Sequence, residues 1–246
     1  MSITGEHDIE GLKRVGAVVA AARDAMGAHV AAGVTTAELD AVGKEILERH
    51  GARSAPQLAY GFPAATCISV NDRLAHGIPS RDCVLAEGDL VNIDVSAELD
   101  GYWADTGASF PVGAVSAQAS ALLRATRMAL EDGMSKARAG EPVRNIGRAV
   151  ERRAKQCGFR VIRNLCGHGV GRAIHEEPSV PNTFERWDRT LLHAGLVITI
   201  EPFLTTGATL AVQDDDGWTL RSNDGSRGAQ FEHTLIVTGG RPIVVT

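Results

Sequence analysis

The sequence predicts a single mixed α/β (α+β) domain over residues 1–246, in which helices cover the outer face of a curved antiparallel sheet. Segments with helical periodicity come in pairs, and β-branched segments of strand length follow each pair. This pattern occurs twice, in halves of about 1–112 and 113–246. Two similar halves predict one continuous sheet with an internal pseudo-two-fold axis.

The first half begins with two amphipathic helices. The spacing of apolar residues predicts one helix that starts near residue 9 and ends near Gly33, and a second over 35–51. Thr35 and Glu38 form a capping box at the start of the second helix. A loop rich in proline, alanine and aromatic residues follows, and then a strand over 66–70.

A β-hairpin over 90–111 lies at the centre of the predicted site. Its Asp-Gly pair at 100–101 is a strong signal for a two-residue turn, which pairs Ser96 with Asp105. A four-residue loop would instead place Asp94 opposite Asp105. In both registers the two carboxylates share one face, because side chains alternate along a strand. Their repulsion favours protonation or a bound divalent cation, while a solvated surface hairpin is the alternative.

The second half repeats the pattern. Ser116 caps a third helix, Pro142 opens a fourth that ends at Gly158, and the segment 230–237 is predicted as a final strand. An offset of 107 residues aligns Gly33 with Gly140.

The same offset aligns the segment 85–94 with 192–201, so Glu201 becomes the counterpart of Asp94. Glu232, in the final strand, becomes the partner of Asp105. Duplication therefore predicts that four carboxylates converge near the axis between the halves.

Composition excludes several classes of protein. The net charge of -5 and the scattered basic residues give no footprint for nucleic-acid binding. No apolar run approaches the roughly 18 residues of a membrane span. An acidic N-terminus does not fit a secretion signal, so we expect a cytoplasmic protein. The four cysteines include no close pair of the kind that binds zinc.

Four carboxylates and His168, in the run Cys-Gly-His-Gly-Val-Gly, form the candidate site. This open, oxygen-rich set suits two hard or borderline dications about 3.5–4 Å apart, such as Mn, Fe or Co. Water between two such ions would lose a proton near neutral pH.

Further motifs at 67–71 (Cys-Ile-Ser-Val-Asn), 76–79 (His-Gly-Ile-Pro) and 216–218 (Asp-Gly-Trp) complete an ordered set. With it, nearly the whole chain resembles the type I methionine aminopeptidases. The resemblance implies the pita-bread fold and two divalent ions (Co, Mn, Fe or Zn), with these metal ligands: Asp94, Asp105, His168, Glu201 and Glu232.

The implied activity is removal of the initiator methionine from nascent polypeptides, by attack of a metal-bridging hydroxide on the first peptide bond. The protein is expected to be a monomer, with the ribosome as a further candidate partner. Glu201 is the candidate general base. His175 would hydrogen-bond the scissile amide and stabilise the tetrahedral intermediate. His76 would reach the substrate beyond the scissile bond.

The methionine pocket is expected to be apolar, with Phe62, Cys67 and Trp218 at positions that the family uses for it. The chain departs from the family pattern at four places. It has Ile174 where phenylalanine is frequent, and its tyrosine ahead of Gly61 is displaced from position 59, now alanine, to Tyr60. The other two departures are Ala75 and Gly228.

Two other functions fit parts of the sequence. A proline-specific aminopeptidase or dipeptidase of the same fold would share all five ligands, but such enzymes usually carry a further N-terminal domain. A non-catalytic binding module on this fold would normally have lost its ligands, and here all five are present.

Overall fold

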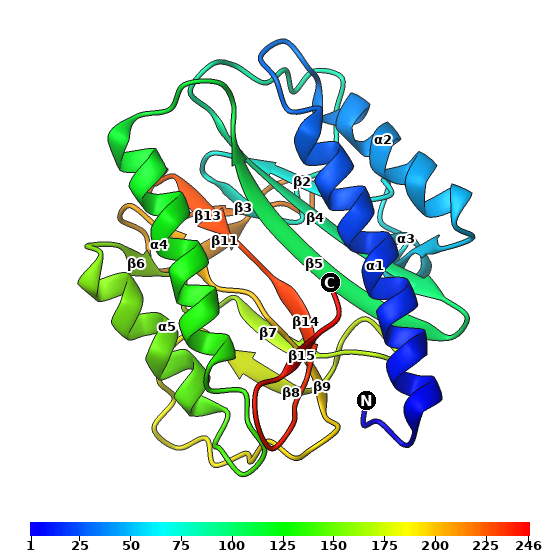
Figure 1. Ribbon diagram of the computed structural model, residues 1–246. Coiled ribbons are helices and arrows are strands. Elements are labelled where there is room, and N and C mark those ends of the chain that lie inside the picture. The colour runs from blue at the N-terminus through cyan, green and yellow to red at the C-terminus, as the bar shows by residue number, and fades with distance from the viewer.

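Two helix pairs cover one side of a set of antiparallel strands in the computed structural model, which describes residues 1–246 (Figure 1). Figure 1 shows α1 and α2 on one side of the view and α4 and α5 on the other, with the C-terminus between them. The elements in chain order are α1 (Glu6–Ala28), α2 (Thr36–Arg49), β1 (Arg53–Ser54), α3 (Ala55–Tyr60), β2 (Cys67–Val70), β3 (Arg73–Ala75), β4 (Leu90–Leu99), β5 (Tyr102–Pro111), α4 (Ala117–Met134), α5 (Arg144–Gln156), β6 (Arg160–Val161), β7 (Cys166–Gly169), β8 (Glu176–Pro181), β9 (Val197–Ile200), β10 (Phe203–Thr205), β11 (Ala211–Gln213), β12 (Leu220–Ser222), β13 (Gly228–Gln230), β14 (His233–Ile236) and β15 (Ile243–Val244).

Hydrogen bonding divides the strands into four groups rather than the one continuous sheet expected. β1, β2 and β5 all pair with β4, and β15-β14-β9-β7-β8 form a five-stranded sheet. Two three-stranded sheets, β13-β10-β6 and β11-β12-β3, complete the set. Every strand pair is antiparallel, so the predicted fold class is confirmed.

The predicted strand over 230–237 is wrong as a single element. β13 pairs with β10 and β14 pairs with β9, so the chain changes partner between them. At this crossing Phe231 bridges to Ala108 of β5, and the Glu232 N–H donates to the Gly107 carbonyl at 2.8 Å. The crossing carries Glu232 onto the hairpin.

Most helix boundaries follow the local signals. The capping box of Thr35 and Glu38 is present, and the Ser116 hydroxyl accepts from the third residue of α4. α1 ends at Ala28, with His29 as its C-cap, rather than near Gly33. The Gly33 N–H makes no helical bond and donates to the Leu85 carbonyl.

Two boundaries near proline differ from expectation. α5 begins at Arg144, since Pro142 is held in an extended bridge with Leu191. The segment expected to be a loop after α2 contains the short helix α3. Ser54 caps α3 and Gly61 ends it in the left-handed conformation, so both signals were present in the sequence.

Equivalent hydrogen bonds join equivalent residues in the two halves. The Gly33 N–H donates to the Leu85 carbonyl and the Gly140 N–H donates to the Leu192 carbonyl, both at 2.8 Å. The two donors are 107 residues apart, and so are the two acceptors. The two glycines have φ angles of 90° and 88°, which other residues adopt only with strain. The division into two related halves remains our proposal, and these contacts support it.

Apolar clusters attach each helix pair to the strands. Leu12, Val15 and Val19 of α1 pack with the alternate residues Val91, Ile93 and Val95 of β4. In the second half, α4 and α5 pack against β9 and β14. None of the helices has the length and apolar character that a membrane crossing requires.

Candidate metal centre

The hairpin adopts the two-residue turn. Ser96 pairs with Asp105, and the turn residues Asp100 and Gly101 have φ angles of 52° and 81°. Both positive angles are typical of the tight turn that matches the twist of the strands. Asp94 lies two residues from Ser96, so the predicted common face of Asp94 and Asp105 is confirmed.

The structure brings all five predicted ligands together. Ligand atoms of Asp105, His168 and Glu232 all lie within 4.8 Å of one another. The Nε2 atom of His168 is 3.6 Å from Glu201 Oε1 and 3.8 Å from Asp105 Oδ2. Asp94 shares the face of the hairpin with Asp105, and it lies close enough for the Asp105 charge to raise its pKa. That these residues bind metal remains a prediction.

The four carboxylates of the cluster lie close together with little solvent around them, so their charges repel one another. Burial first, and then the charges of the neighbouring carboxylates, raises the pKa of Asp94, Glu201 and Glu232 well above the ordinary range. No Lys or Arg side chain pairs with any of the four, and the basic side chain within 4 Å of them is His168, which lies near Asp105 and Glu201. The cluster therefore lacks the positive charge that would make it stable as four anions.

His168 is oriented as a ligand rather than as a cation. Its Nδ1 lies 2.8 Å from the Gly169 carbonyl, so Nδ1–H donates there and Nε2 keeps its lone pair toward the carboxylates. Desolvation lowers the pKa of His168 to about 4, against the opposing charge of Asp105. A neutral imidazole with a free Nε2 is the form that binds a metal.

Five buried side-chain polar atoms have no hydrogen-bond partner in the protein, and two of them, Asp105 Oδ1 and Glu232 Oε1, belong to this cluster. Buried polar atoms nearly always have partners, so two orphaned oxygens in one cluster indicate a partner that the protein itself does not supply. Together with the free lone pair of His168, they give a donor set that fits divalent cations.

A hydrogen-bonded chain supports Glu232 and was not foreseen from the sequence. The Gln230 side-chain amide donates to Glu232 Oε2 at 2.9 Å, and Asn92 donates to Gln230 Oε1 at 2.7 Å. The absence of a side chain at Gly107 leaves room for the Gln230 side chain, since a Cβ atom there would lie 2.2 Å from Gln230 Oε1. The Gln-Phe-Glu spacing places Gln230 two residues before Glu232, a signal that could have suggested this role.

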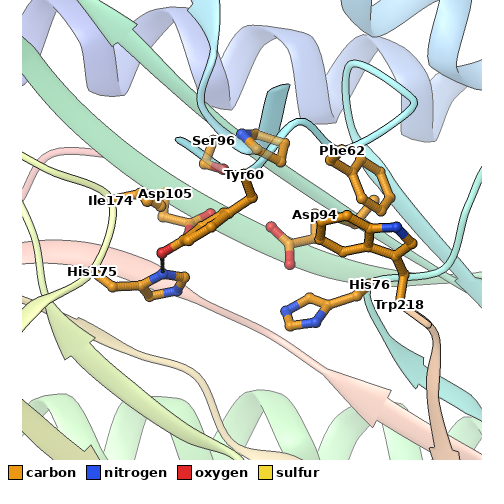
Figure 2. A pocket seen from close by; sticks show the side chains of 11 residues that line it. Tyr60, Phe62, His76, Asp94, Ser96, Asp105, Ile174, His175 and Trp218 are labelled. Atoms are coloured by element: carbon orange, nitrogen blue, oxygen red, sulfur yellow. Dashed lines mark hydrogen bonds between the residues drawn. The ribbon is translucent and has the colours of Figure 1, made fainter. Parts of the chain in front are cut away.

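The cluster opens into a pocket of about 220 Å³ (Figure 2). All of the predicted substrate-binding residues line it: Phe62, Cys67, His76, His175 and Trp218. Phe62 and Trp218 pack edge to face at 5.2 Å, and Cys67 pairs with Asp94 across β2 and β4. Burial raises the pKa of the Cys67 thiol, so it stays neutral and the wall stays apolar.

The two pocket histidines lie on different sides of the pocket, as Figure 2 shows. His175 packs against the His168 ring with the centroids 4.3 Å apart. His76 has a φ of 53°, a left-handed conformation that is uncommon outside glycine. His76 as a whole is solvent-exposed, but its ring is partly desolvated. This desolvation and, second, the neighbouring His175 lower the pKa of the His76 imidazole.

Of the four departures from the family pattern, two line the pocket. Ile174 is buried in its wall, and Tyr60 reaches it although it is displaced by one residue. Ala75 lies in β3 opposite Leu220, and Gly228 packs beneath the Leu74 side chain. Ala59 is exposed and does not line the pocket.

A family model described as metallopeptidase family M24 matches residues 10–239. The chain belongs to metallopeptidase family M24. It is 45% identical over 247 residues to methionine aminopeptidase 2 of Bacillus subtilis, covering 100% of this chain and 99% of the relative. A crystal structure of a methionine aminopeptidase from Thermotoga maritima has a TM-score of 0.96 at 33% identity, covering 100% and 99% of the two chains.

The resemblance inferred from the sequence is thereby confirmed, and so is the pita-bread fold. A prolidase from Pyrococcus furiosus has a TM-score of 0.78 at 22% identity, and this chain covers 65% of it. At that identity the likeness concerns the fold alone. Family membership and the cluster of Asp105, His168 and Glu232 together support the use of divalent metal.

Proposed function

We propose that this chain is a metal-dependent methionine aminopeptidase, which hydrolyses the first peptide bond of polypeptides that begin with methionine. The observation that carries the proposal is a cluster of four carboxylates, of which Asp105 and Glu232 are buried, and a neutral histidine, next to a pocket with apolar walls. The full-length likeness to proteins named methionine aminopeptidase supports the choice of substrate.

We propose that Asp94, Asp105, His168, Glu201 and Glu232 hold two divalent ions. One dication would leave two of the four carboxylate charges uncompensated in a buried site, which is costly. The mixture of oxygens with one imidazole nitrogen suits Mn, Fe, Co or Zn. When bound, such ions supply Lewis-acid polarisation of the scissile carbonyl and water that is more acidic than bulk water.

The residues of the chain itself would bind and orient the substrate. Phe62, Cys67 and Trp218 form an apolar wall that suits a thioether side chain and disfavours a charged one. The opposing histidines place donors on both sides of the scissile bond. His175 is assigned to the scissile amide and His76 to the segment beyond it.

Glu201 is proposed to accept the proton of the attacking water. The Thr199 hydroxyl donates to Glu201 Oε1 at 3.3 Å, which leaves Oε2 free to take a proton. Glu201 follows β9 directly, and the Thr199 hydroxyl also accepts from the His168 N–H at 3.0 Å. The general base is thus held by the same strand that orients the neighbouring imidazole.

The test is peptide hydrolysis by protein stripped with a chelator and reloaded with Mn²⁺ or Co²⁺. We expect release of methionine from Met-Ala-Ser and none from its N-acetylated form. Preference for Xaa-Pro peptides would overturn the substrate assignment in favour of a proline-specific enzyme. Failure to bind either ion would favour a non-catalytic binding module.

The remaining expectations concern partners and location. A polypeptide substrate follows from the proposed activity. A monomer, a cytoplasmic location, contact with the ribosome and the lack of nucleic-acid binding stay predictions. Sedimentation of the protein alone tests the monomer, and sedimentation together with ribosomes tests the contact with the ribosome.

A further inference from the structure

Tyr60 forms part of the pocket at the end of α3, on the side that carries His175 (Figure 2). Its side chain is 51% exposed, so the ring is a wall of the pocket that substrate and solvent both reach. Its phenol oxygen is hydrogen-bonded to Nδ1 of His175, and the two rings are tilted neighbours with centroids 5.6 Å apart. The two residues are 115 positions apart in the chain.

Tyr60 is held in place by its backbone. Gly61 ends α3 in the left-handed conformation with a φ of 70°, and its N–H donates to the Gln57 carbonyl at 3.0 Å. At the other end of α3, the Ser54 hydroxyl donates to the Ala65 carbonyl at 2.7 Å. β1, directly before α3, pairs with β4, the strand that carries Asp94. α3 is therefore anchored through β1 to β4.

The segment that carries His175 is also tied down. The Glu176 carboxylate accepts from the N–H groups of Arg172 and Ala173, at 2.6 and 2.8 Å. Backbone and side-chain hydrogen bonds fix both α3 and the segment of His175. The contact between the phenol and the imidazole therefore joins two ordered segments. Two ordered segments hold a hydrogen bond at little further entropic cost.

The direction of this bond decides what His175 offers to the pocket. A neutral imidazole carries one N–H, and its position follows from the bond that the other nitrogen makes. If the phenol donates to Nδ1, the proton of the ring lies on Nε2, which can then donate to a carbonyl oxygen. If Nδ1–H donates to the phenol, Nε2 is an acceptor and cannot stabilise an oxyanion.

Burial raises the pKa of the Tyr60 phenol, which keeps its proton available for donation. No other protein group bonds to the phenol or to Nδ1. We propose that Tyr60 is a positioning residue, which donates to Nδ1 of His175 and so fixes the tautomer with Nε2–H toward the pocket. This inference rests on the proposed function, because it assigns His175 a donor role toward the substrate.

The first test uses kinetics on Met-Ala-Ser with the Mn²⁺-loaded, full-length chain. Tyr60→Phe keeps the ring and removes only the hydroxyl. We expect kcat to fall about tenfold with little change in KM, which corresponds to about 1.4 kcal/mol and lies within the range for one hydrogen bond. In a His175→Ala background, the same change should alter kcat less than about twofold, since its target is gone. Leu58→Ala, on the exposed side of α3, is the control and should leave kcat unchanged.

The second test reads the tautomer directly by ¹⁵N NMR of histidine-labelled, metal-free protein, with His175→Gln used to assign its signals. We expect Nε2–H in the wild type and a mixture of tautomers in Tyr60→Phe. Nδ1–H in the wild type would overturn the proposal. So would an unchanged kcat in Tyr60→Phe, or an equal loss in both backgrounds. If the wild type releases no methionine, the proposed function fails, and the NMR result still decides whether Tyr60 sets the tautomer.

Discussion

The substitution Gly107→Ala tests whether the hydrogen bonds that support Glu232 contribute to stability and to metal affinity. An alanine Cβ there would lie 2.2 Å from Gln230 Oε1 and 2.5 Å from its Nε2, far inside van der Waals contact. The Gln230 side chain is buried and must move, because β5 and β13 fix the backbones on both sides. Moving it breaks the bonds of 2.7 Å to Asn92 and 2.9 Å to Glu232.

The cost follows from the two bonds. The bond to the carboxylate is worth about 1.5–3 kcal/mol and the neutral one about 0.5–1.5 kcal/mol, so Gly107→Ala should lose about 2–4.5 kcal/mol of unfolding free energy. For a chain of this size that lowers Tm by about 4–18 °C. Because Gln230 orients a proposed ligand, we also expect affinity for Mn²⁺ or Co²⁺ to fall about 10- to 100-fold.

Thermal unfolding of stripped protein and calorimetric titration with Mn²⁺ measure the two effects separately. Gly239→Ala is the matched control, since a Cβ there meets nothing within 4 Å and its φ is ordinary. The double variant Gly107→Ala with Gln230→Ala relieves the overlap, so it should recover part of the Tm but not the affinity. If Gly107→Ala matches Gly239→Ala in both Tm and affinity, the support assigned to Gln230 is wrong.

Three further predictions test the pocket, the metal centre and the N-terminal helix. Trp218→Leu should raise KM for Met-Ala-Ser about tenfold with little change in kcat, because an apolar wall binds ground state and transition state alike; steady-state kinetics checks this against the unaltered Leu58→Ala control. Saturation of stripped protein with Mn²⁺ at about 100 times its Kd should add about 2.7 kcal/mol of stability, and an unchanged Tm would contradict a buried site that needs cations. Donation from the Thr4 hydroxyl, and then from the Thr4 N–H, holds the pKa of Asp8 far below its ordinary value. Since the folded pKa is the lower one, this stabilisation is present above the unfolded pKa of about 3.9 and is lost as pH falls. Asp8→Asn should therefore lower Tm at pH 7, and the gap to the wild type should shrink below about pH 4; a gap independent of pH would refute this reasoning.

Local patterns were sufficient for the shared face of the hairpin carboxylates and for most of the helices. The common face of Asp94 and Asp105 follows from strand alternation and from an Asp-Gly turn, both of which depend on neighbours in sequence. Thr35 and Ser116 begin their helices for the same reason, because a cap bonds to residues within one turn. The offset between the halves identified Glu201 as the counterpart of Asp94, and the place of Glu232 in the final strand made it the expected partner of Asp105. That these residues bind metal stays a prediction.

Contacts between distant segments decided the rest. The bond from Asn92 to Gln230 spans 138 residues, and the one from Tyr60 to His175 spans 115, so no local pattern could reveal either. The strand expected over 230–237 is divided because it changes partner from β10 to β9, a choice made by the sheets around it. Residue types and their spacing identify the candidate functional residues. The orientation and hydrogen-bonded support of these residues depend on side chains that only the folded chain brings together.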